Sequence, residues 1–73
     1  MIYMVSRDER GARKLALDMG IPQGKWRHIG RPEQMHGLRG VRYVIVNYGG
    51  FPVDMREHME ELIRALDWKE VWE

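Results

Sequence analysis

Two continuous apolar runs constrain the fold of this chain more than any other feature. Residues 2–5 (IYMV) and 43–46 (YVIV) contain no charged side chain. Runs of this kind are typical of strands that are covered on both faces, as in parallel sheets. A helical stripe with the spacing i, i+3, i+4 and i+7 follows the first run: Ala12, Leu15, Ala16 and Met19. A covered strand followed by an amphipathic helix predicts an α/β fold with a parallel sheet.

Local signals delimit the two long helices. Ser6, with Glu9 three residues later, predicts a capping box before the first helix, and Gly20 predicts its end. Asp54 predicts the N-cap of a second long helix, which should end near residue 67. The expected buried stripe of this second helix is Met55, Met59, Leu62, Ile63 and Leu66.

The remaining segments complete a minimal α/β unit. Residues 25–29 predict an edge strand, Pro32 begins a short helix, and residues 41–47 predict a central strand. The C-terminal tail forms either a fourth strand or a frayed apolar end. With right-handed crossovers, the strand order is 2-1-3, or 2-1-3-4 if the tail pairs. We therefore expect residues 1–73 to form a single Rossmann-like domain with three layers.

Composition limits what such a domain can do. The 73 residues include no cysteine, which excludes disulfides, cysteine-based zinc sites and thiol nucleophiles. No apolar run approaches the roughly 20 residues of a membrane span, so we expect a soluble, cytoplasmic protein. The net charge of +1 conceals an asymmetry. Residues 1–42 carry nine bases and four acids (+5), whereas residues 43–73 carry three bases and seven acids (−4).

The basic first half suggests an anion site. Ligands of open parallel sheets bind beyond the carboxyl ends of the strands. Residues near the expected strand ends, or in the basic half, are candidates for contact with an anion or a nucleic acid: Arg7, Arg10, Arg31, Arg39, Asn47 and Gly49. The alternative is that these arginines are solvated and that the glycine supplies only turn geometry.

No catalytic or metal-binding constellation is recognisable. The three histidines, His28, His36 and His58, fall on different elements without ligand spacing. Residues 20–26 (GIPQGKW) differ from a phosphate-binding loop, because only three residues separate the glycines and Trp26 replaces the magnesium-binding Ser/Thr. We therefore expect no enzyme activity, no cofactor and no metal.

Six methionines and three tryptophans are many for so small a core. Trp and Met are favoured at protein interfaces, where large or adaptable side chains fill pockets. The candidates for a protein interface are Trp26, Trp68, Val71 and Trp72. The alternative, that the tryptophans only complete the core, remains open.

Several segments also carry a family resemblance. The pattern combines Trp26-Arg27-His28-Ile29, Gly37-Leu38-Arg39-Gly40 and an apolar strand ending in Tyr48-Gly49. It resembles small, mostly uncharacterised Rossmann-like proteins of actinobacterial bacteriophages. The resemblance implies a role in infection, in which the chain binds and modulates a host protein in the infected cell. It implies no catalytic residues.

A weaker likeness is to the C-terminal lobe of helicases. Arg13, Ala16 and residues 34–42 carry it. The expected function is thus a non-enzymatic interaction protein that binds a host protein. The alternative is a nucleic-acid or nucleotide binder that uses the basic first half. Self-association is compatible with either function.

Overall fold

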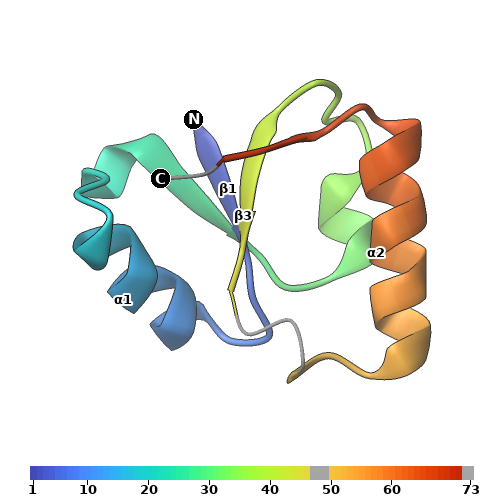
Figure 1. The fold of residues 1–73 in the computed structure, drawn as a ribbon, viewed down its shortest axis with the longest axis horizontal. Coiled ribbons are helices and arrows are strands. Elements are labelled where there is room, and N and C mark those ends of the chain that lie inside the picture. The colour runs from blue at the N-terminus through green and yellow to red at the C-terminus, as the bar shows by residue number, and fades with distance from the viewer. Residues whose placement is uncertain (47–49, 72–73) are drawn as a thin grey trace.

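A computed structural model describes residues 1–46 and 50–71 and shows one parallel sheet (Figure 1). Its four strands lie in the order β2-β1-β3-β4. Their bounds are Ile2–Val5 (β1), Trp26–Ile29 (β2), Arg42–Ile45 (β3) and Lys69–Glu70 (β4). All three strand pairs are parallel. The predicted α/β fold and the order 2-1-3-4 are confirmed, because the C-terminal tail does pair with β3.

The helices form two layers around this sheet. Helix α1 (Glu9–Asp18) covers one face, whereas α2 (Val53–Ala65) and the 3-10 turn η2 (Pro32–Met35) cover the other (Figure 1). A second 3-10 turn, η1 (Gln23–Lys25), leads into β2. The connection from β1 to β2 crosses the sheet in one direction. The connections from β2 to β3 and from β3 to β4 cross it in the other direction. Right-handed crossovers therefore place α1 on one face of the sheet and η2 and α2 on the other.

Each face of the sheet has its own hydrophobic core. The core beneath α2 consists of Val5, Ile29, Met35, Tyr43, Phe51, Met59 and Trp68. The core beneath α1 is smaller and consists of Met4, Ala12, Ala16 and Val44. Neighbouring strand residues such as Met4 and Val5 belong to different cores, because successive side chains of a strand point to opposite faces.

Both predicted helix N-caps are wrong. The N-cap of α1 is Asp8, whose Oδ1 accepts a hydrogen bond from the Gly11 N–H at 2.8 Å. Ser6 lies two residues before this N-cap. Its Oγ donates to the Asp8 carbonyl at 2.7 Å, and its N–H bonds to the Ile29 carbonyl at 3.0 Å, which extends the pairing of β1 with β2. Helix α2 begins at Val53 and has no side-chain cap. Asp54 instead lies in the first turn of α2, where the positive end of the helix dipole stabilises its negative charge.

The helix ends agree better with the sequence. Gly20, just after α1, has the left-handed φ of 73° that glycine tolerates at such a position. Helix α2 ends at Ala65, and Asp67 adopts a φ of 56° before the chain enters β4. The Trp68 N–H then bonds back to the Ile63 carbonyl at 3.0 Å. This reversal turns the tail towards β3.

Tyr43 makes the stability of the fold depend on pH in alkaline solution. The residue is 7% exposed. Burial raises the pKa of Tyr43 above its ordinary value of 10.0, and the charge of Glu70, its partner across β3 and β4, raises this pKa further. The folded state therefore holds the phenolic proton more tightly than the unfolded state. This contribution to stability is fully present below the pKa of Tyr43 in the unfolded chain, and it is lost as pH rises through the pKa of Tyr43 in the folded protein.

We expect the free energy of unfolding to fall as the solution becomes alkaline, and Tyr43→Phe to remove that fall. Urea titrations between about pH 8 and about pH 11 measure it. Glu70→Gln serves as the matched variant and should reduce the fall only in part. An equal fall in wild type and Tyr43→Phe would show that another group is responsible.

Candidate functional site

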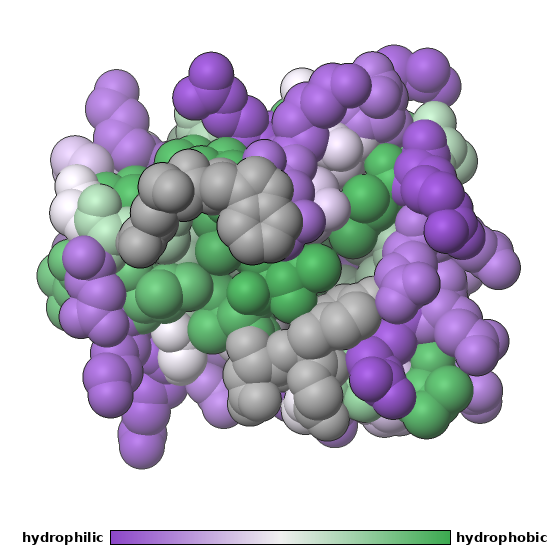
Figure 2. All heavy atoms as spheres, in the orientation of Figure 1, coloured by the Kyte–Doolittle hydropathy of each residue, from purple (hydrophilic) through white to green (hydrophobic). Residues whose placement is uncertain are grey.

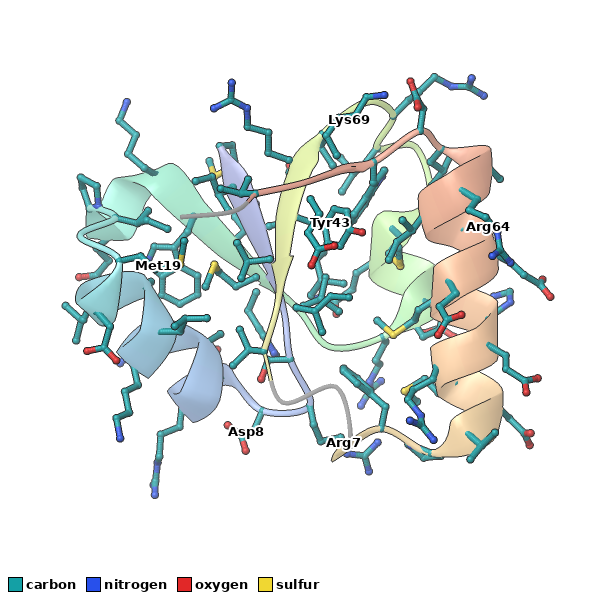
Figure 3. All side chains as sticks on the ribbon, viewed as in Figure 1. Arg7, Asp8, Met19, Tyr43, Arg64 and Lys69 are labelled. Carbon is teal, nitrogen blue, oxygen red and sulfur yellow. The ribbon has the colours of Figure 1, made fainter. Side chains whose placement is uncertain are left out.

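The carboxyl ends of β1 and β2 bring two arginines to one place. The strands pair in register, so that Val5 lies opposite Ile29, and both residues belong to the core beneath α2. Arg7 and Arg31 each follow two residues later. Both arginines line one hollow together with Met55 of α2, so their side chains lie on the α2 side of the sheet. Figure 3 shows Arg7 extending towards the start of α2, whereas Asp8 lies on the side of α1.

Gln34 holds the segment that carries Arg31. Its Oε1 accepts hydrogen bonds from the N–H groups of Gly30, at 2.7 Å, and Arg31, at 3.0 Å. The Gln34 N–H in turn donates to the Arg31 carbonyl at 3.1 Å. These bonds occupy the backbone donors of the turn and fix the position from which the Arg31 side chain extends.

His28 and Gly30 complete the same corner. The His28 Nε2 donates to the Ser6 carbonyl at 2.9 Å, since a carbonyl oxygen can only accept. A Cβ atom on Gly30 would lie 2.9 Å from Cε1 of this imidazole and 3.5 Å from the Ser6 carbonyl oxygen. Glycine is therefore needed here for the close approach of the ring to the backbone.

A hollow of about 820 Å³ lies at this corner, between the strand ends, η2 and the first turn of α2. Its walls are formed by Arg7, His28, Gly30, Arg31, Glu33, Gln34 and Met55. Arg7 and Arg31 are exposed, and neither forms an ion pair within residues 1–46 and 50–71. We name this feature the arginine hollow.

The other predicted anion contacts are not gathered there. Arg10 lines a separate small hollow on α1 with Glu9 and Arg13, which form an exposed ion pair at 2.9 Å. Arg39 precedes β3 and thus lies at the amino edge of the parallel sheet, opposite the arginine hollow. Asn47 and Gly49 lie outside the described residues. The described candidates therefore do not form the continuous basic stripe of a typical nucleic-acid surface.

The described residues predicted to form a protein interface lie on different faces of the sheet. Trp26 and Val71 each pack against the core beneath α1, but Trp26 lies on one edge strand and Val71 follows the other. We call the partly buried apolar residues around this core the α1-face patch: Ile2, Leu15, Met19, Ile21, Trp26, Val46 and Val71. Figure 2 shows hydrophobic surface at the left and centre of the view, where Figure 1 places α1 and the strands.

Trp68 requires a correction, because it is a core residue and not an exposed one. It is 5% exposed, and its Nε1 donates to the Leu38 carbonyl at 2.7 Å. Its ring centroid lies 5.8 Å from those of Tyr3 and Tyr43. The reversal after α2 turns this side chain inwards, which helical spacing alone could not indicate. Trp72 lies outside the described residues.

Sequence reasoning missed Glu33, Gln34 and Met55 as residues of the hollow. One signal was available for Gln34, which stands three residues after Arg31 and two after a helix-starting proline. Among the described residues, no three His, Asp or Glu side chains are grouped as metal ligands. None of the described helices has the length and hydropathy to cross a bilayer.

Comparisons with known proteins found no match to a family model, a curated protein or a solved structure. The local geometry must therefore support any functional assignment.

Proposed function

We propose that this chain is a non-enzymatic interaction protein that binds and modulates another protein through the α1-face patch. The observation that carries the proposal is the incomplete cover of one face of the sheet. Helix α1 joins β1 to β2 and packs against those two strands. In the described parts of the chain, no second helix lies on this face to cover β3 and β4.

The side chains on this face suit a protein partner. Trp26 is only partly buried and stands on an edge strand, and Val71 follows the opposite edge strand. Met19 contributes a flexible apolar side chain at the end of α1 (Figure 3). Partly exposed apolar residues around a core, with a tryptophan and a methionine among them, are typical of the side chains that interfaces bury.

The expected partner is a protein of a bacterial host. This part of the proposal rests on the resemblance of the sequence to small actinobacteriophage proteins, which also favours modulation of the partner over catalysis. A second copy of this chain is the competing occupant of the α1-face patch.

Trp26→Ser tests the proposal. Affinity purification from an actinobacterial lysate should retain a partner on wild type, and purified partner should bind Trp26→Ser about tenfold or more weakly in calorimetry. Leu17→Ser is the matched control, because Leu17 lies on α1 but is 74% exposed and outside the α1-face patch. It should bind like wild type. Circular dichroism checks that both variants remain folded.

Three results would contradict this function. A partner that binds wild type and Trp26→Ser equally would exclude the α1-face patch, and no retained partner would exclude the interaction itself. Sedimentation that shows a stable dimer dependent on Trp26 would replace the host protein with a second copy of the chain.

A further inference from the structure

The geometry points to a binding site for a phosphate monoester in the arginine hollow. This inference is independent of the proposed protein interface, because the two features lie at opposite ends of β2. Trp26 begins this strand, and Arg31 follows its end. The ligand class follows from charge, donor geometry and volume.

The positive charge of the arginine hollow favours an anionic ligand. Arg7 and Arg31 follow the ends of neighbouring strands, and the guanidinium side chains of both line the hollow. Neither group is neutralised by an ion pair in the described ranges. The carboxylate of Glu33 also lines the hollow, so these three groups carry a net charge of +1. An anion bound in the hollow would be attracted by both guanidinium groups.

The donors favour phosphate over a carboxylate. Each guanidinium presents several N–H groups that can bind two oxygens at once. A phosphate monoester carries about −1.5 to −2 charges near neutral pH and has three terminal oxygens, which matches two arginines better than a single carboxylate does. Gln34 adds its amide NH₂ group as a donor, since its Oε1 is already bonded to Gly30 and Arg31.

The size and walls of the hollow indicate a small molecule. A volume of about 820 Å³ lies within the range of small-molecule sites. Met55 supplies an apolar wall from the first turn of α2, against which the organic part of the ligand can pack. The N–H groups of Gly30 and Arg31 already bond to Gln34 Oε1, so the arginine side chains hold the phosphate.

Titration of the ¹⁵N-labelled protein tests this site. The probes are inorganic phosphate, a nucleoside 5′-monophosphate and sodium chloride at matched ionic strength. Both phosphate probes should cause saturable shifts at the amides of Gly30 and Arg31 and at arginine Nε–Hε groups, whereas chloride should not. Arg7→Gln and Arg31→Gln should each weaken binding about tenfold or more.

Two further variants sharpen the test. Arg39→Gln removes the same charge at the opposite edge of the sheet and should bind like wild type. Glu33→Gln should tighten binding about two- to fivefold, a gain that misfolding cannot produce.

Four results would overturn the site. The first is a set of amide shifts that fails to saturate with phosphate. The second is a set of equal shifts with sodium chloride. The third is an equal loss of binding in Arg39→Gln. The last is an oligonucleotide that binds far more tightly than the mononucleotide with a steep dependence on salt, which would indicate a nucleic-acid surface.

Discussion

Trp68→Ala is expected to remove most of the stability of this protein. Replacing a buried tryptophan by alanine costs about 3–5 kcal/mol of unfolding free energy. Domains as a class are stable by only about 5–15 kcal/mol, and a chain of 73 residues should lie near the lower limit. The substitution also leaves the Leu38 carbonyl without its donor and removes the ring between Tyr3 and Tyr43. Urea unfolding monitored by circular dichroism measures the loss.

Trp68→Phe is the matched variant for this prediction. It retains an aromatic ring in the core but cannot donate to the Leu38 carbonyl, so it should cost about 1–3 kcal/mol. An exposed interface tryptophan would behave differently, since its removal would weaken binding and leave stability almost unchanged. If Trp68→Ala unfolds within about 1 kcal/mol of wild type, the placement of Trp68 in the core is wrong.

Met4→Ala is expected to have the second largest effect, on the opposite face of the sheet. Met4 is fully buried in an interior strand, where it packs with Ala12, Ala16 and Val44. Truncation to alanine should cost about 2–5 kcal/mol, because the small neighbouring side chains cannot fill the cavity. The urea midpoint of unfolding, with its slope, measures this change.

Two control variants separate packing from other causes. Met4→Leu conserves most of the volume and should cost less than about 1.5 kcal/mol. Leu17→Ala removes a similar apolar group from the exposed side of α1 and should change stability by no more than about 0.5 kcal/mol. Equal losses in Met4→Ala and Leu17→Ala would show that the core beneath α1 is not closed.

The division of the sheet into two differently covered faces links stability to the proposed function. The face beneath α2 and η2 contains the larger core, including Trp68, and contributes most of the buried aromatic area. On the α1 face, the helix contributes only two small side chains to the buried core, Ala12 and Ala16, which fill little volume. Substitutions in the α1-face patch should therefore affect partner binding more than folding.

Local patterns in the sequence determined the architecture. The apolar runs predicted two interior strands, and the stripe from Ala12 to Met19 predicted which side of α1 meets the sheet. Gly20 marked the end of α1. These signals are local because a strand or an amphipathic helix must present its apolar side chains with its own period, whatever lies around it. With right-handed crossovers, the strand order was limited to 2-1-3 or 2-1-3-4, and the pairing of the tail with β3 decided for the second.

Only the tertiary structure decided the helix caps and the roles of individual tryptophans. Asp8 and not Ser6 is the N-cap of α1, because the helix begins only at Glu9, while the Ser6 N–H still bonds to Ile29 at the end of β2. Trp68 became a core residue because the chain reverses after α2. The arginine hollow likewise depends on the register that places the ends of β1 and β2 side by side. The sequence shows which side chains can be buried and which are charged. Contacts between distant segments arise only when the sheet forms. The periodicity of one element contains no information about its neighbour.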